Sequence, residues 1–179
     1  FAKKNNIEEQ QVLDLIDLVA ISIAADIVPI LGENRILAYY GLELINKNPR
    51  TGIKAILELN AIRRELNITD VVFIIAPRIN AAGRMDHGRS AVQLLISDSV
   101  GDAITESEKI NKNNIDRRDA DKLITEHALQ QISRDNTFEN RRSTVVYSAE
   151  WNKGVIGIVA SRLTEKFYRP TVVLTDSNG

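Results

Sequence analysis

The segment "STVVYSAEWNKGVIGIVASRLTEKFYRPTVVLTD", residues 143–176, decides the fold class of this chain. Two short runs rich in β-branched residues, "STVVYSA" (143–149) and "PTVVLTD" (170–176), flank "VIGIVASRLTEKF" (155–167), which has helical spacing. Two strands joined by a helix are typical of a parallel pair with a crossover connection. The segment therefore predicts the N-terminal part of an α/β domain over residues 141–179.

The chain upstream of this unit is expected to be mostly helical. Residues 7–28 are apolar on nearly every face, which is typical of a buried helix, and Pro29 predicts its end near Ile27. Two more helices are expected at 33–47 and 49–66, whereas "VVFIIA" (71–76) has the composition of a strand.

Residues 88–134 have a helical and increasingly charged pattern with one apolar stripe, and such a long polar helix often bridges two domains. Residues 133–143 break this pattern and are interpreted as a linker. We therefore expect three parts: a mostly helical part (1–75), a middle part with the bridging helix (76–140), and the α/β part (141–179).

The composition excludes several classes of protein. The 179 residues contain no cysteine, which excludes a disulfide scaffold and a thiolate zinc site. The longest apolar run, residues 13–30, is interrupted by three aspartates and is expected to be a buried helix and not a membrane span. No secretory signal is visible, so a cytoplasmic setting is expected. The chain starts without Met and ends after a strand-like run, so we expect a fragment of a longer protein.

Asp26 is the first candidate for a functional side chain. It lies in "AISIAADIVPI" (20–30), among apolar residues at the expected end of a buried helix. Burial and the negative end of the helix dipole both disfavour an ionised carboxylate, whereas a nearby metal ion would keep it ionised. A capping role or an ion pair with Arg35 explains the residue equally well. Asp17 lies on the opposite face of such a helix and is interpreted as a buried structural acid.

The stretch "APRINAAGRM" (76–85) places two arginines around small and amide side chains. The planar guanidinium of Arg78 or Arg84 is suited to phosphate, Asn80 could add a neutral donor, and Gly83 permits close approach. Because the net charge is only −1, binding to nucleic acid would depend on such local clusters. The alternative is a pair of surface arginines beside a turn.

The helix expected after Trp151 carries small residues on one face, at Gly154, Gly157, Ala160 and Ser161. This face either binds an anion near the helix N-terminus or packs closely on the sheet. Trp151 could stack on a base, although a core position explains it better. His87 and His127 are far apart and are expected to be solvated, although "HGRS" (87–90) could contribute to a phosphate site.

Three blocks of the sequence resemble the RecJ-like exonucleases of the DHH/DHHA1 phosphoesterase superfamily. They are "DLVAISIAADIVPILGENR" (17–35), "APRINAAGRM" (76–85) and "WNKGVIGIVASRLTEKFYRP" (151–170), in the order of the family. The resemblance implies the C-terminal helical part of a DHH domain, a bridging helix and the start of a DHHA1 domain. It also implies hydrolysis of single-stranded DNA from the 5′ end with Mn²⁺ or Mg²⁺. The implied partners are single-stranded DNA and repair proteins such as a helicase or a single-strand-binding protein, with no membrane.

The resemblance also implies roles for individual residues. Asp26 matches an aspartate of the metal-binding set. Arg78, Asn80 and Arg84 match a segment beside the nucleic-acid path, and Ser161 and Arg162 are further nucleic-acid candidates.

Some family features are missing from the chain. The DHH triplet and a "GSGRS"-like segment are absent, and Asn152 stands where members often carry His. We therefore expect no nuclease activity and at most weak, salt-sensitive DNA binding from these 179 residues alone. Two alternatives remain: a phosphodiesterase of the same superfamily that acts on short oligonucleotides or cyclic dinucleotides, and a non-catalytic DNA-binding scaffold.

Overall fold

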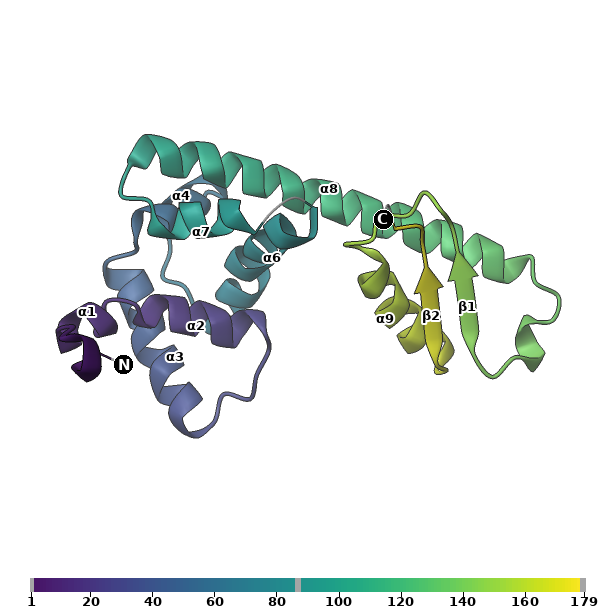
Figure 1. Ribbon diagram of the computed structural model, residues 1–179, viewed down its shortest axis with the longest axis horizontal. Helices are drawn as coiled ribbons and strands as arrows, with labels where there is room; N and C mark the ends of the chain where they lie inside the picture. Colours follow the sequence, from purple (N-terminus) through teal and green to yellow (C-terminus); the bar gives the residue numbers. More distant parts are fainter. Residues whose placement is uncertain (1, 86–87, 178–179) are drawn as a thin grey trace. The chain divides into compact units, whose positions relative to one another are not determined.

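The computed structural model describes residues 2–85 and 88–177. It divides into two compact units, Phe1–Asn114 and Ile115–Gly179. The helix α8 (Val100–Ser133) contributes its first part to unit 1 and its remainder to unit 2 (Figure 1). The predicted long helix between the two parts of the chain is thus present, and its first residue is Val100.

Within its described residues, the regular elements of unit 1 are all helices, joined by loops (Figure 1). The predicted helix at 33–47 is confirmed as α3, whereas the predicted helix at 7–28 is divided into α1 and α2 around Asp14 and Leu15. The elements of unit 1 before α8 are η1 (Lys3–Asn5), α1 (Glu9–Leu13), α2 (Ile16–Ala25), α3 (Gly32–Lys47), α4 (Thr51–Leu59), α5 (Ile68–Asp70), η2 (Val71–Ile75), α6 (Ala76–Met85) and α7 (Arg89–Ile96).

The strand predicted at 71–76 is wrong, because these residues are helical. The elements α5, η2 and α6 form one uninterrupted helix from Ile68 to Met85, and η2 is a π-helical stretch within it. A proline inside a helix clashes with the carbonyl of the fourth residue before it, which for Pro77 is Phe73. The wider π turn directly before Pro77 gives that ring room, which explains why the proline does not end the helix.

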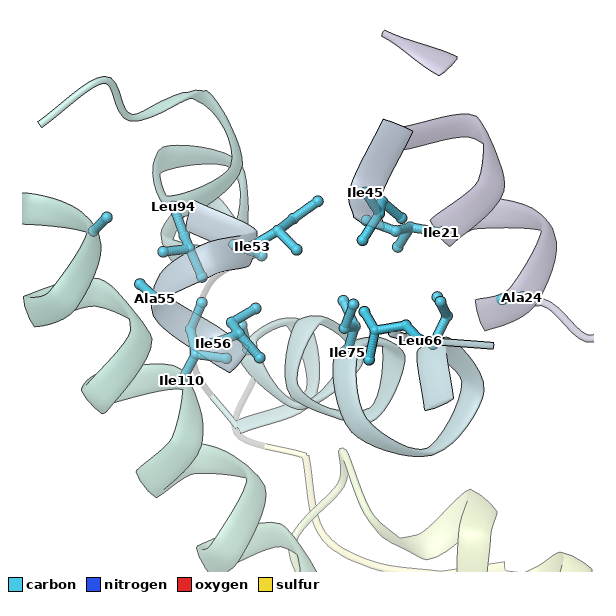
Figure 2. Close-up of a cluster of buried hydrophobic side chains, with 14 residues drawn as sticks. Ile21, Ala24, Ile45, Ile53, Ala55, Ile56, Leu66, Ile75, Leu94 and Ile110 are labelled. Carbon is cyan, nitrogen blue, oxygen red and sulfur yellow. The ribbon is translucent and has the colours of Figure 1, made fainter. Parts of the chain in front are cut away.

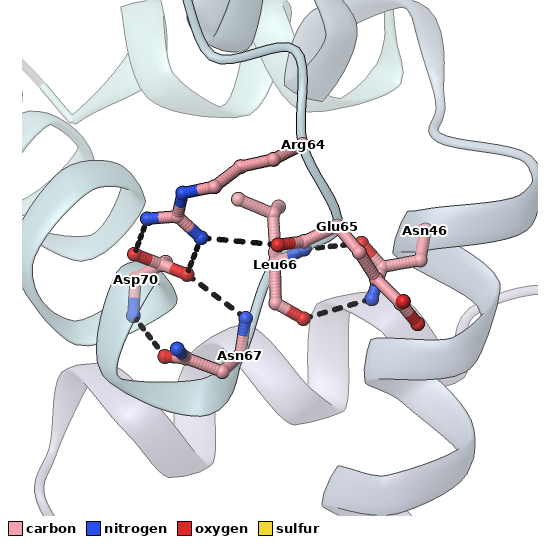
Figure 3. A network of polar contacts seen from close by, with 6 residues as sticks. All are labelled: Asn46, Arg64, Glu65, Leu66, Asn67 and Asp70. Atoms are coloured by element: carbon pink, nitrogen blue, oxygen red, sulfur yellow. Dashed lines mark hydrogen bonds and ion pairs between the residues drawn. The ribbon is translucent and has the colours of Figure 1, made fainter.

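A capping box fixes the start of this helix (Figure 3). The Asn67 side chain accepts from the Asp70 backbone N–H at 3.0 Å, and the Asp70 carboxylate accepts from the Asn67 backbone N–H at 2.9 Å. Arg64 donates to both Asp70 oxygens at 2.6 and 2.7 Å. The Arg64 guanidinium and the Asn67 N–H together hold the pKa of the Asp70 carboxyl at about 2, below its ordinary 3.8.

The low pKa of Asp70 predicts a loss of stability in acid. Because the folded state holds the carboxylate ionised, its contribution is complete above about pH 4 and disappears as the pH falls toward about 2. Thermal melts followed by circular dichroism should show a gap in Tm between the native chain and Asp70→Asn that shrinks over this range. Asp102→Asn, at an exposed carboxyl of α8, is the control. A gap of constant size from pH 5 to pH 2 would show that Asp70 does not titrate as described.

The core of unit 1 is an isoleucine-rich cluster shared by most of its helices (Figure 2). Ile53 and Ile56 of α4 and Ile75 of η2 are each at most 1% exposed. The β-branched residues of "VVFIIA" therefore serve the core in a helix, with Val71 and Ile75 buried. The cluster consists of Ile21, Ala24, Ile45, Ile53, Ala55, Ile56, Leu66, Val71, Ile75, Ala82, Ala91, Leu94, Ala103 and Ile110.

Unit 2 confirms the predicted strand–helix–strand pattern. Strands β1 (Thr144–Tyr147) and β2 (Thr171–Leu174) pair in parallel, with Thr144 opposite Thr171, and α9 (Ile156–Phe167) connects them. Val159 and Leu163 of α9 are fully buried. The α/β fold class predicted from this segment is therefore confirmed.

The segment 133–143 lies within unit 2 and packs there through a buried aromatic side chain, so its interpretation as a linker between parts of the chain is wrong. It contains the short helix η3 (Phe138–Asn140), and Phe138 is buried against the ring of Phe167 at 4.9 Å between centroids. Arg169 lies over the Phe138 ring and donates to the carbonyls of Phe138 and Arg141 at 3.0 and 2.7 Å. The charged residues of this segment predict a solvated linker, whereas Phe138, with Arg169 over its ring, fixes the segment to the rest of unit 2.

Candidate nucleic-acid interface

The side of α6 that faces solvent carries three of the residues singled out in "APRINAAGRM". Asn80, Gly83 and Arg84 are exposed, and Gly83 and Arg84 follow Asn80 by three and four positions, so they lie on the same side of the helix as Asn80. Ala81 and Ala82 are fully buried on the other side. We call Asn80, Gly83 and Arg84 the α6 exposed face.

Gly83 adds no side chain to this face, so the helix backbone is accessible there. A Cβ added at Gly83 would meet no atom within 4 Å, and the residue lies inside a regular helix. Neither internal packing nor an unusual backbone angle accounts for a glycine here. A flat surface beside an exposed amide and an exposed guanidinium is suited to close approach by an extended anionic chain.

Arg78 has a different environment, although it belongs to the same helix. Its guanidinium donates to the Ile74 carbonyl at 2.6 Å and to Asn111 Oδ1 of α8 at 3.1 Å, and also to Asn60 Oδ1 at the end of α4. The side chain is half-buried. These bonds tie α6 to α4 and to the unit 1 part of α8, so the structure gives Arg78 a role in the fold beside the predicted phosphate contact.

Asp26 is exposed, so the prediction of a buried acid is wrong. It caps the C-terminus of α2, where the chain leaves the core, and residues 26–33 are all exposed. Ile27, which follows it, has φ of 50° and is 78% exposed. This backbone is unfavourable for a β-branched residue, and such outliers are concentrated at functional sites.

The alternative for Asp26, an ion pair with Arg35, does not occur among the described residues. Residues 2–85 and 88–177 also contain no group of three or more histidine or carboxylate side chains placed to hold a metal ion. A divalent cation needs about six oxygen ligands. Asp26 could supply one of them, and the described residues do not by themselves complete a metal site.

Asp17 is the buried structural acid that the sequence predicted. It is 1% exposed, and both of its oxygens accept from Arg50, at 2.6 Å each. Arg50 was not singled out from the sequence, since no local pattern connects it to an acid 33 positions away.

The two candidates on α9 lie in unit 2. Ser161 is exposed and its hydroxyl donates to the Gly157 carbonyl at 3.2 Å. Arg162 is 58% exposed at its side chain, and its guanidinium pairs at 2.8 Å with Asp121 of α8, a buried carboxylate. A Cβ at Gly157 would meet no atom within 4 Å, so close packing on the sheet does not explain this glycine.

Trp151 is a core residue, which confirms the alternative that the sequence favoured over stacking on a base. It is 5% exposed, and its indole N–H donates to His127 Nδ1 at 3.1 Å. His127 is exposed but fixed by this bond, so the prediction of a merely solvated histidine is incomplete. His87 lies outside the described residues.

Within the described part of the chain, no helix is both long and apolar enough to span a membrane.

Comparison with known proteins finds the same relatives by sequence and by structure. The chain is 38% identical over 162 residues to the single-stranded-DNA-specific exonuclease RecJ of Bacillus subtilis, an overlap that covers 90% of this chain and 20% of that protein. It is 36% identical over 176 residues to Escherichia coli RecJ, covering 94% of this chain and 30% of that protein. No family model matches the chain.

Solved RecJ structures share the fold. The crystal structure of Thermus thermophilus RecJ in complex with Mg²⁺ matches with a TM-score of 0.83 and 29% identity, covering 97% of this chain and 27% of that chain. A structure of exonuclease RecJ bound to manganese matches with a TM-score of 0.82 and 28% identity, covering 97% of this chain and 43% of that chain. The match extends over the helical unit and the α/β unit alike.

Over nearly its whole length, the chain therefore belongs to the RecJ family. It spans between 20% and 30% of the length of the curated relatives that it matches.

Proposed function

We propose that this chain is the part of a RecJ-like, single-strand-specific 5′ to 3′ exodeoxyribonuclease that guides the DNA backbone. The α6 exposed face contacts the phosphates of the single strand through Arg84 and Asn80. The observation that carries the proposal is the arrangement of an exposed amide, a glycine with open space above it, and an exposed arginine on one side of α6. The names of the relatives, single-stranded-DNA-specific exonucleases, support the substrate.

The other arginines have supporting roles in this proposal. Arg78 orients α6 through its bonds to Asn60 and Asn111, and these bonds engage guanidinium donors that a phosphate would otherwise use. In unit 2, Arg162 and Ser161 provide a second contact region, in which the Arg162 side chain is 58% exposed.

The proposed cofactor is Mn²⁺ or Mg²⁺, which the related structures contain. Asp26 is the proposed ligand from this chain. Because the described residues do not complete a metal site, we propose that the 179 residues lack nuclease activity on their own. The proposed setting is the cytoplasm, in DNA repair and recombination, with a helicase or a single-strand-binding protein as partner.

Binding and cleavage assays on this chain test the proposal. Fluorescence anisotropy should show weak binding to a labelled single-stranded oligonucleotide, weaker binding to the duplex of the same sequence, and a loss of affinity with added salt. Incubation with Mn²⁺ should leave the oligonucleotide intact. Equal affinity for duplex and single strand, or robust manganese-dependent degradation by the 179-residue chain, would contradict the proposal.

A phosphodiesterase for short substrates is the alternative within the same superfamily. Competition by dinucleotides or cyclic dinucleotides separates the two, since a guide for long single strands should be displaced by a long oligonucleotide and not by a dinucleotide. For a non-catalytic scaffold, the longer protein that contains this segment should bind single strands and fail to shorten them with Mn²⁺.

A further inference from the structure

One large apolar side chain lies in solvent on the same helix as the α6 exposed face. Phe73 is 71% exposed, whereas Val71 and Ile75 on either side of it are fully buried. A phenylalanine left in water gives up the burial that favours its ring. Packing within unit 1 therefore does not explain why a phenylalanine stands at position 73 of η2.

The burial pattern places Phe73 on the side of the helix that carries the α6 exposed face. Exposed or half-exposed residues recur at intervals of four, four, three and four, at Thr69, Phe73, Pro77, Asn80 and Arg84. Intervals of three and four are the signature of one helix side. Phe73 and Arg84 are thus on one side, roughly 15 Å apart along the helix axis.

Two features make this arrangement suited to a single strand. Helical side chains lean toward the helix N-terminus, so the Cα–Cβ bond of Arg84 is tilted toward the Phe73 end of the helix. The π turn also widens the helix where Phe73 projects, and π-helical turns are frequent at functional sites. Between them on this side lie the half-buried Pro77 and the exposed Asn80.

We propose that Phe73 is a stacking platform for a nucleobase of the single strand whose phosphates contact Arg84 and Asn80. Every base has a π-face, so an aromatic ring on the same side of a helix as a cationic contact can bind single-stranded DNA without sequence preference. This inference rests on the proposed function and adds to it the residue that distinguishes unpaired from paired bases. A base in a duplex has both faces covered and cannot use Phe73.

Variants that separate stacking from packing test the role of Phe73. Phe73→Tyr and Phe73→Trp keep an aromatic face, whereas Phe73→Leu keeps apolar bulk and loses the π-system. We expect the aromatic variants to bind a single-stranded oligonucleotide as the native chain does, and Phe73→Leu to bind about ten-fold more weakly. Tyr39→Leu is the matched control, since Tyr39 is a 64% exposed aromatic residue on α3.

An oligonucleotide of the same length built from abasic sites gives the second readout. The native chain should bind it about ten-fold more weakly than the normal strand, and Phe73→Leu should bind both alike. If Phe73→Leu binds the normal strand like the native chain, or is weakened equally on both strands, the stacking role is overturned. An unchanged affinity in Arg84→Ala would instead overturn the proposed function, so the two failures are distinguishable.

Discussion

Arg50→Ala should lower the free energy of unfolding of unit 1 by about 3–5 kcal/mol, the largest effect that we expect from a single side chain. Arg50 donates to both oxygens of Asp17 at 2.6 Å, and Asp17 is 1% exposed. The same guanidinium donates to the carbonyls of Asp14 and Leu95 at 3.1 and 3.2 Å. Its removal leaves the buried Asp17 carboxylate without its counter-ion. It also removes the hydrogen bond to the Asp14 carbonyl, which lies where the chain passes from α1 to α2.

Urea denaturation followed by circular dichroism measures this effect. Lys54→Ala is the control, because Lys54 and Glu58 are both more than 60% exposed and 3.9 Å apart, and such pairs contribute at most about 1 kcal/mol. Replacing both partners, as Asp17→Leu with Arg50→Met, should recover much of the loss, since no unpaired charge is left. A loss below about 1 kcal/mol in Arg50→Ala would show that the buried pair does not hold the helices together.

The second large effect is expected from adding a single methyl group to Gly52. A Cβ there would lie 2.0 Å from the Leu94 backbone oxygen and 2.7 Å from its carbonyl carbon. The backbones of α4 and α7 are therefore in contact at this glycine, and one of them must move. Gly52→Ala should cost about 1–3 kcal/mol or more.

The same substitution at Gly83 is the matched control, with the opposite sign. Gly83→Ala meets open space inside a helix and should stabilise unit 1 by about 0.5–1 kcal/mol, because alanine loses less backbone entropy than glycine. Thermal melts of the two variants and the native chain measure both changes together. If Gly83→Ala lowers Tm, the open space described at Gly83 is contradicted. If Gly52→Ala leaves Tm unchanged, the close contact described between Gly52 and Leu94 is contradicted.

The parts of the fold that local pattern determines were predictable from the sequence. The strand–helix–strand of unit 2 has two β-branched runs at the spacing of a crossover, and both runs formed strands. In "VVFIIA" the same composition formed a helix, because the capping box of "NITD" (67–70) starts it and Pro77 is accommodated by a π turn. The capping box is visible in the sequence and could have corrected the prediction.

The sequence could predict which residue types form the candidate site, but it could not predict their burial or their hydrogen-bond partners. Arg78 and Arg84 look alike in the sequence, yet the partners of Arg78 are 18 and 33 positions away, so only the tertiary structure separates them. Asp26 stands among apolar letters and is exposed, because exposure depends on where the chain leaves the core. Phe73 was counted as part of a strand, whereas it lies in a helix and its side chain is 71% exposed.

The phosphate contact at Arg84 is tested most directly by the salt dependence of single-strand binding in three chains: the native chain, Arg84→Ala, and Arg63→Ala as an exposed arginine outside α6. Loss of one phosphate contact should weaken binding about ten-fold at low salt. It should also make the slope of log K against log salt shallower by about 0.7. Arg63→Ala should keep the native affinity and slope. A native affinity and slope in Arg84→Ala would contradict the assignment of the α6 exposed face as the DNA contact.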